Sequence, residues 1–369
     1  MTTTSSHRRC PRTPVDLLYV ASGTTAGLRQ ADAEMLSALS ELGVDVLAVS
    51  ASYSAPRLTR RYVERSLLTI DAFESFALRR ATARALRSHA PRAIIYSTTH
   101  AAMLQPRSCP RGRVAIRFDT PAQMSRTGAT YWVEYLLERR RFKRAALLIP
   151  SALELSPDTA RILPAHTPVV PIPIPIELGD APPADARDSI AVFYAASPEK
   201  KGLDVAVRAW AAVAPVERTL TITGIDRQRG LDYLHERGID EPAAVEWTGL
   251  LSPDEHRALT RRAEIYLAAS RYENYGIVQL EALADGSALV TTPSPGPFAA
   301  LPIARSLDAR LVAADESPSA LATALQAAFA RDHDERVTYR ARARKHLRAF
   351  SREETSRRLR EEVLPVLLT

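Results

Sequence analysis

Short apolar runs rich in β-branched residues alternate with longer helix-like stretches along most of the chain. Continuous apolar runs of this kind are typical of strands covered on both faces, as in a parallel sheet. In the first half of the chain the pattern predicts strands at 15–22, 44–51, 93–98, 114–119 and 146–151. In the second half it predicts strands at 190–196, 219–224, 244–249, 265–270, 288–293 and 309–314.

Helical segments separate most of these strands, and the clearest in the second half lie at 203–213, 253–262, 276–284 and 317–329. Strands that alternate with helices predict doubly wound parallel sheets with right-handed crossovers. Between the two halves, residues 165–188 are rich in proline, which lacks an N–H and forces an extended backbone. We interpret this stretch as a linker that contains at most one short strand.

The sequence therefore predicts an α/β fold of two Rossmann-like lobes that face each other across a cleft. We expect an N-terminal lobe at 14–164 and a C-terminal lobe that begins at 189. Residues 1–13 contain basic residues but no apolar segment after them. They are expected to form a flexible tail and not a secretory signal.

Composition and charge narrow the functional classes. The 369 residues suit two soluble domains, and no apolar run reaches the ~18–20 residues that a membrane-spanning helix needs. Cys10 and Cys109 are far apart and form no zinc or disulfide pattern, which favours a reducing cytoplasm. The net charge of +7 favours anionic partners, while no motif indicates nucleic acid.

Much of the positive charge lies in the predicted N-terminal lobe, at Arg57, Arg60, Arg61, Arg65, Arg79, Arg80, Arg84, Arg87, Arg139, Arg140, Arg141, Lys143 and Arg144. Solvated helix faces are the ordinary interpretation of such runs. The alternative is a surface that docks an anionic acceptor or the inner face of an anionic membrane.

Familiar cofactor motifs are missing from the sequence. No GxGxxG follows any predicted strand, and the nearest pattern is Gly23-x-x-x-Gly27 after the first one. A nicotinamide or flavin site is therefore disfavoured. There is no Walker A sequence, no HExxH and no DxD-type cluster, so we expect neither a cofactor nor a metal requirement.

The most informative string is SRYENYGIVQLEALADG, from Ser270 to Gly286. It places Glu273 in the loop after a predicted strand and Glu281 inside the helix that follows. Ligands of open α/β sheets bind beyond the carboxyl ends of the strands, where a helix N-terminus also offers free N–H groups. Gly276 lets a ligand approach the backbone closely. By themselves, two acids near a helix start are common and stabilising.

Taken as a whole, this string resembles the signature of the GT-B glycosyltransferases of family 4, the group 1 retaining enzymes. In that signature an aromatic residue and glycine follow the first acid, as Tyr275 and Gly276 do here, and EA-x-A-x-G begins at the second. A second family motif, Lys-Gly after the first strand of the C-terminal lobe, is matched by Lys201 and Gly202. The resemblance also implies that the C-terminal lobe ends at 348 and that residues 349–369 form a helix crossing back to the N-terminal lobe.

Two positions depart from the family pattern. The family's arginine five places before the lysine corresponds to Ala196, and a histidine often found after the fifth strand of the N-terminal lobe is replaced by Asp119. His100, at the end of the preceding strand, is a candidate for the missing histidine. Arg271 or Lys200 is a candidate for the missing positive charge.

The resemblance implies a role for each matched residue. Lys201 would stabilise the donor diphosphate, Glu281 would hold the ribose hydroxyls, and Glu273 would hold the transferred sugar. Asp119 would orient the acceptor or the sugar. The residues implied in donor binding are Lys201, Gly202, Gly224, Leu250, Glu273, Asn274, Tyr275, Gly276, Ile277 and Glu281. Those implied in acceptor or phosphate contact are Gly23, Gly27, His100 and Arg271.

The function implied is a metal-independent, retaining hexosyltransferase that uses a nucleoside-diphosphate sugar and acts in the cytoplasm. A peripheral position at the inner membrane face is the alternative. The sequence does not name the base, the sugar or the acceptor. Two alternatives stay open: a GT-B scaffold that binds a sugar nucleotide without transferring it, and a GT-B epimerase or phosphorylase. Ala196 and Asp119 favour the scaffold, whereas Lys201, Glu273 and Glu281 favour transfer.

Overall fold

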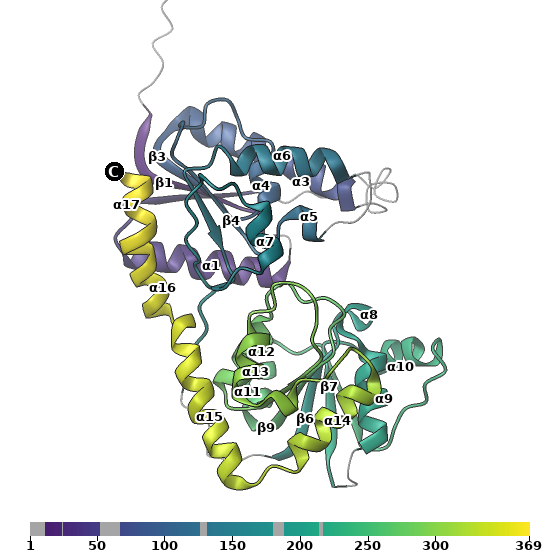
Figure 1. Cartoon of the computed structure of the whole chain (residues 1–369). Helices are drawn as coiled ribbons and strands as arrows, with labels where there is room; N and C mark the ends of the chain where they lie inside the picture. The colour runs from purple at the N-terminus through teal and green to yellow at the C-terminus, as the bar shows by residue number, and fades with distance from the viewer. Residues whose placement is uncertain (1–11, 24, 52–66, 126–130, 180–187, 214–216) are drawn as a thin grey trace, which may run out of the picture. The chain divides into compact units, whose positions relative to one another are not determined.

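The computed structural model describes residues 12–23, 25–51, 67–125, 131–179, 188–213 and 217–369 (Figure 1). The chain forms two compact units, Met1–Ile174 together with Thr355–Thr369, and Pro175–Glu354. Each unit is built on one parallel sheet of five strands.

The first sheet contains β1 (Thr13–Ala21), β2 (Val46–Ser50), β3 (His89–Tyr96), β4 (Val114–Phe118) and β5 (Leu147–Pro150). Its strands run in the order β2-β1-β3-β4-β5, and every pair is parallel. The order reverses between β1 and β3. From β1 the chain adds β2 on one side, and then β3, β4 and β5 on the other. All five strands of the first half agree with the sequence prediction, and β3 begins earlier than predicted.

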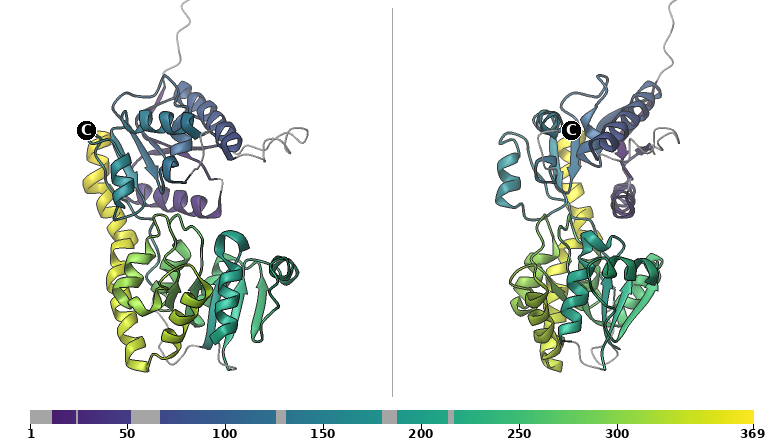
Figure 2. Two further views of the ribbon diagram at one scale, coloured as in Figure 1. Left: turned by 45° about the vertical axis from the view of Figure 1, so that its right-hand side comes forward. Right: turned by 90° about the vertical axis from the view of Figure 1, so that its right-hand side faces the viewer.

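The helices of the first unit are α1 (Ala26–Glu41), α3 (Leu67–Ser88), α4 (Thr99–Met103), α5 (Ala122–Ser125), α6 (Trp132–Phe142), α7 (Pro157–Ile162), the end of α16 (Arg352–Arg358), the π-helix η5 (Leu359–Val363) and α17 (Leu364–Leu368). Figure 2 shows the C-terminal segment, in yellow, ending beside the strands of this sheet.

Alternation along the strands divides the first unit into two apolar layers. Leu17 and Tyr19 point to one face, where α1 and the C-terminal residues Leu359, Val363 and Leu367 cover them. The neighbouring strand residues point to the other face, which is covered by α3, α4 and α6. In Figure 1, α1 accordingly lies on the opposite side of the sheet from α3 and α6. Helices on both faces explain why the strands are apolar along their whole length.

The second sheet contains β6 (Asp188–Tyr194), β7 (Thr219–Thr223), β8 (Val245–Gly249), β9 (Ala263–Ala268) and β10 (Ala288–Thr291). Its order is β10-β9-β6-β7-β8, and again every pair is parallel. Counted from its own first strand, this is the 3-2-1-4-5 order of a Rossmann fold. The order reverses between β6 and β9.

The helices of the second unit are α8 (Pro198–Lys201), α9 (Leu203–Val213), α10 (Arg227–His235), α11 (Pro253–Arg262), α12 (Ile277–Ala284), α13 (Ala300–Leu307), the 3-10 helices η3 (Ala309–Leu311) and η4 (Arg348–Phe350), α14 (Pro318–Phe329), α15 (His333–Leu347) and the start of α16. The sequence marks several of these starts. At α11, Ser252 and Glu255 form a capping box and Pro253 takes the first turn, so the helix begins where predicted.

One predicted strand, at 309–314, is wrong. The segment forms η3 and then a single bridge between Val312 and Thr291. The Asp308 side chain accepts a hydrogen bond from the Arg310 N–H, at 3.1 Å, and so starts a helical turn. Leu311 is nevertheless fully buried, which explains why the run is apolar without being a strand.

In the predicted linker, the described residues 165–179 contain no helix, and Val169 makes one bridge to Leu148 of β5. Residues 180–187 and the tail residues 1–11 lie outside the described part of the chain. Among the described residues, no helix combines the length and the apolar character needed to cross a bilayer.

Candidate functional site

The strand order of the second sheet creates a crevice at one place. β6 and β9 are neighbours, but the chain continues from β6 to β7 on one side and from β9 to β10 on the other. The loops that follow them, at 195–202 and 269–276, therefore diverge, and this is where open α/β sheets bind ligands. Lys201 lies after β6 and Glu273 after β9, so folding brings the two predicted residues to the same crevice.

Lys201 and Glu273 form a direct ion pair, with Lys201 Nζ 2.6 Å from Glu273 Oε2. Ser270 Oγ and Gln279 Nε2 donate to the same Oε2, at 3.0 Å and 3.1 Å. Burial by itself raises the pKa of Glu273, but the charge and hydrogen bond of Lys201 outweigh it and leave the pKa below its ordinary value. Glu273 is therefore an ionised carboxylate, and all three of these hydrogen bonds end on one of its oxygens.

Gly202 fixes the position of Lys201. It ends α8 with φ +69°, in the left-handed region, and a Cβ on it would lie 2.0 Å from the carbonyl oxygen of Ala269. The two loops thus touch at their backbones, and the N–H of Arg271 donates to the carbonyl of Lys200 at 2.9 Å. Only glycine allows this approach, which explains the Lys-Gly pairing structurally.

Gly276 plays the corresponding part after β9. It precedes α12 with φ +84°, and a Cβ would lie 2.7 Å from the ring of Phe298. Tyr275 is buried, Asn274 is exposed, and Ile277 opens the helix. The backbone N–H groups of the first turn of α12 therefore face the crevice side, where a helix N-terminus favours an anion.

Glu281 lies one turn further along α12 and is half-buried. Its Oε1 is 3.7 Å from Nη1 of Arg257, a guanidinium held mainly by Asp285 at 2.6 Å and 3.0 Å. Both Glu273 and Glu281 act on the buried hydroxyl of Tyr266, whose pKa is raised well above its ordinary value by burial first and by the two carboxylates next. Both acids of the sequence motif are therefore close enough to this hydroxyl to act on it electrostatically.

Arg271 was a candidate for the missing positive charge at Ala196. Its guanidinium instead bonds Asp204 of α9, at 2.7 Å, and the carbonyl of Glu199. This pairing raises the pKa of Arg271 and ties it to the α8–α9 corner. Lys200 is exposed and close enough to Glu273 to lower the pKa of that acid.

Gly224 and Leu250 follow β7 and β8 at the same edge of the sheet. The Gly224 N–H donates to the Gly249 carbonyl at 2.8 Å, and a Cβ on Gly224 would lie 2.7 Å from the ring of Tyr194. Leu250 is 82% exposed. A small pocket at this edge is lined by residues of β6, α8, β9 and α12 that include Tyr194, Lys201 and Gln279.

In the first unit, Gly23 follows β1, Asp119 follows β4, and Gly27 is exposed in the first turn of α1. Gly23 has φ +61°, and its carbonyl accepts a hydrogen bond from Arg29 at 3.1 Å. Asp119 is half-buried. Burial by itself lowers the pKa of Arg117, but the charges of Tyr19 and then of Asp119 and Asp32 outweigh it and raise that pKa. These residues share the carboxyl edge of the first sheet.

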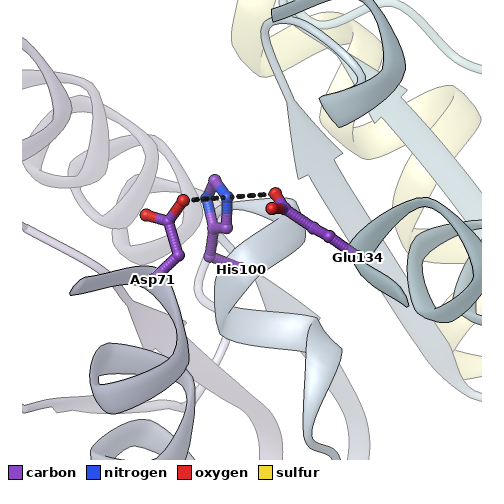
Figure 3. Close-up of side chains that lie close together, drawn as sticks. All are labelled: Asp71, His100 and Glu134. Atoms are coloured by element: carbon purple, nitrogen blue, oxygen red, sulfur yellow. Dashed lines mark hydrogen bonds and ion pairs between the residues drawn. The ribbon is translucent and has the colours of Figure 1, made fainter. Parts of the chain in front are cut away.

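His100 follows β3 at this edge and bonds two acids. Its Nε2 lies 3.0 Å from Glu134 Oε1 and 3.3 Å from Asp71 Oδ2 (Figure 3). Burial by itself would lower the pKa of His100, but the two carboxylates outweigh it and raise the pKa to about 9. The sequence indicated His100 but neither acid, because both lie in helices far from it along the chain.

Sequence reasoning also missed the partners inside the motif itself. Ser270 and Gln279 appear in the quoted string, yet only the turn at Gly276 directs them at Glu273. Asp285 reads as a helix stop, whereas it is 2% exposed and binds both Arg257 and Arg261. Its role is to attach α12 to α11.

Residues 188–331 match the family model described as "Glycosyl transferases group 1", which covers most of the second unit. No curated protein matches the chain significantly.

Solved structures match nearly the whole chain. Sucrose-phosphate synthase from Thermosynechococcus elongatus aligns with a TM-score of 0.68 at 16% identity, covering 95% of this chain and 98% of that one. Anabaena HepE in complex with UDP-glucose aligns with 0.67 at 13% identity, covering 95% and 100%. WaaG, a glycosyltransferase involved in lipopolysaccharide biosynthesis, aligns with 0.64 at 15% identity, covering 92% and 98%. These likenesses confirm the predicted GT-B class of α/β fold.

Proposed function

We propose that this chain, a glycosyltransferase by its group 1 domain, transfers a sugar from a nucleoside-diphosphate sugar with retention of anomeric configuration and without a metal ion at the donor. The observation that carries the proposal is the Lys201–Glu273 pair at the crevice between β6 and β9. It joins a cation for the diphosphate to an ionised carboxylate for a sugar hydroxyl.

The geometry of the second unit supports a particular mode of donor binding. The ammonium group of Lys201 exchanges Glu273 for the diphosphate as its ion-pair partner. The diphosphate also accepts hydrogen bonds from the N–H groups at the start of α12. Glu273 keeps Ser270 and Gln279 on Oε2 and accepts a hydroxyl of the sugar on Oε1. Glu281 accepts the ribose hydroxyls. We propose a UDP-sugar as the first donor to test, since HepE is described in complex with UDP-glucose.

The transfer step needs little beyond electrostatics. The bond between the anomeric carbon and the diphosphate oxygen breaks, and the acceptor oxygen bonds the same face of that carbon. The acceptor proton passes to the leaving phosphate. Lys201, with Lys200 as the second cation in place of the family's arginine, stabilises the charge that develops on the leaving group. We propose that the carboxyl edge of the first sheet, with Gly23 and Asp119, binds the acceptor.

The test is release of nucleoside diphosphate from a panel of sugar nucleotides, with the anomeric configuration of any product determined by NMR. Glu281→Ala is expected to weaken donor binding at least about tenfold, because a charged hydrogen bond contributes about 1.5–3 kcal/mol. Glu273→Ala is expected mainly to slow transfer. Glu236→Ala, at a side chain 75% exposed in the same unit, is the matched control. Equal donor affinity in wild type and Glu281→Ala would refute the ribose assignment.

A scaffold that binds the donor without transferring it is the second candidate, and Ala196 is the observation that favours it. Arg271, the candidate guanidinium for this place, is held by Asp204 instead. Donor binding with no diphosphate release from any donor would favour the scaffold. Release that rises in Ala196→Arg would show instead that the chain is an enzyme with a weakened phosphate contact.

We also propose peripheral contact of the first unit with an anionic membrane on the cytoplasmic side. Exposed apolar side chains lie at the starts of α3 and α6, at Phe73, Phe76, Trp132, Val133 and Leu136. Exposed basic residues follow on the same helices and directly after α6, at Arg79, Arg80, Arg84, Arg87, Arg139, Arg140, Lys143 and Arg144. Arg141 is excluded because it bonds the Met103 carbonyl, and Arg57, Arg60, Arg61 and Arg65 lie outside the described residues.

Such a surface combines apolar anchors with positive charge, as interfacial helices do. Flotation with anionic vesicles at low salt is expected to recover the wild-type protein and to lose Trp132→Ser. Val337→Ser, which changes an exposed valine of the second unit, is the control. Failure of the wild type to bind anionic vesicles at low salt would reject the membrane contact and leave the donor chemistry untouched.

A further inference from the structure

Three metal-ligand side chains from three helices converge in the first unit. Asp71 comes from α3, His100 from α4 and Glu134 from α6, and Figure 3 shows the imidazole between the two carboxylates. One ligand atom from each residue lies within 4.8 Å of the other two. The three residues are far apart along the chain, so only the fold brings them together.

The protein's own groups do not satisfy this cluster. His100 Nε2 carries at most one hydrogen, yet it faces Glu134 Oε1 at 3.0 Å and Asp71 Oδ2 at 3.3 Å. Glu134 is 2% exposed, and its second oxygen, Oε2, is buried without a hydrogen-bond partner among the described residues. A buried, unpartnered carboxylate oxygen is costly, which favours a ligand at this position.

The charges around the cluster are also unbalanced. Glu74 and Glu138 are buried as well and close enough to interact with the charge of His100. Glu74 accepts from Ser22 Oγ, and Glu138 accepts from the N–H of Ala122 with both oxygens at 3.0 Å. Four acidic side chains therefore surround one imidazole, which carries at most one positive charge. A bound divalent cation would bring further positive charge to this acidic cluster.

We propose that Asp71, His100 and Glu134 bind one Zn²⁺ ion, with a fourth position open to solvent. Zinc takes imidazole nitrogen and carboxylate oxygen at about 2.0–2.2 Å in a tetrahedral arrangement, which places neighbouring ligand atoms about 3.3–3.5 Å apart. The two distances at Nε2 are close to this spacing, so only small side-chain movements admit the ion. The His100 side chain is 20% exposed, which leaves a path for entry and for a water ligand.

The ion would join α3, α4 and α6 and give Glu134 Oε2 a partner. This site lies in the first unit and involves neither Lys201 nor Glu273, so it stands independently of the donor chemistry proposed above. It also changes the interpretation of His100, which becomes a metal ligand and not a direct contact to acceptor or phosphate.

The experiment uses the full chain, stripped with chelator and freed of any affinity tag, titrated with ZnCl₂ by calorimetry. We expect one zinc per chain, and a loss of affinity of at least about 100-fold in Glu134→Gln, since even the outer partners of metal ligands matter about 10–100-fold. His166→Gln, at an exposed histidine of the same unit, is expected to bind zinc as the wild type does.

If Glu134→Gln does not fold, the wild type still decides the question through Co²⁺. Cobalt in the site is expected to give the visible absorption bands of tetrahedral coordination, which ZnCl₂ then removes. Absence of zinc binding by the wild type would overturn the proposal, as would cobalt binding without those bands. Zinc binding with equal affinity in Glu134→Gln would overturn it too, because the carboxylate would then not be a ligand.

Discussion

The Lys201–Glu273 pair supports a quantitative prediction, because its two side chains are only 19% and 8% exposed. Removing one partner of a buried ion pair leaves an uncompensated charge and typically costs about 3–5 kcal/mol. Ser270 and Gln279 remain on Glu273, so we expect Lys201→Met to lower the free energy of unfolding by about 3 kcal/mol, the lower end of that range.

The double variant Lys201→Met/Glu273→Gln removes both charges and keeps the size of the acid. It is therefore expected to be more stable than Lys201→Met alone, which a double-mutant cycle measures as the coupling energy. The control is Arg262→Met, which breaks the pair with Asp188 in the same unit. Those side chains are 67% and 43% exposed, so the expected loss is only about 0–1 kcal/mol.

The assay is urea unfolding of the full chain followed by tryptophan fluorescence, since Trp210 and Trp247 both belong to the second unit. The lowered pKa of Glu273 adds a pH check. Its stabilising effect should be complete above its ordinary pKa of 4.5 and be lost as the pH falls through the lower pKa of the folded protein. Equal losses in Lys201→Met and Arg262→Met would refute a buried pair at this site.

Two further changes test how the site is held in place. Gly202→Ala should lower the free energy of unfolding more than Gly238→Ala does. Both sites have positive φ, at which a side chain costs about 1–2 kcal/mol, but only the new Cβ at Gly202 would clash with a backbone oxygen, that of Ala269. Equal urea midpoints would contradict this. Asp285→Asn should destabilise the second unit by about 3 kcal/mol, because it removes the closer of the two carboxylates beside the half-buried Arg257 and leaves Glu281 at 3.7 Å. The donor affinity of this variant, measured by calorimetry, should also fall, because α12 is then less firmly attached to α11.

Much of the fold could be predicted from local patterns in the sequence. The apolar runs predicted all ten strands that the described residues form, because strands covered on both faces are apolar along their length. Helix starts such as Pro253 with Ser252 before it could be read directly, since the capping groups are neighbours in sequence. The failure at 309–314 came from the same rule, because burial alone makes a run apolar, whether or not it pairs as a strand.

The sequence by itself determined which residues of the second unit stand after strands, and so that Lys201, Glu273 and Gly276 would meet at one edge of a parallel sheet. It could not determine which of them pair. Only the tertiary structure pairs Lys201 with Glu273 and Arg271 with Asp204. It also brings His100 into contact with two acids that are distant in the sequence. The physical reason is that hydrogen bonds and ion pairs depend on directions and on distances of a few ångströms. Strand order and glycines in the left-handed region determine these directions and distances, whereas spacing along the chain does not.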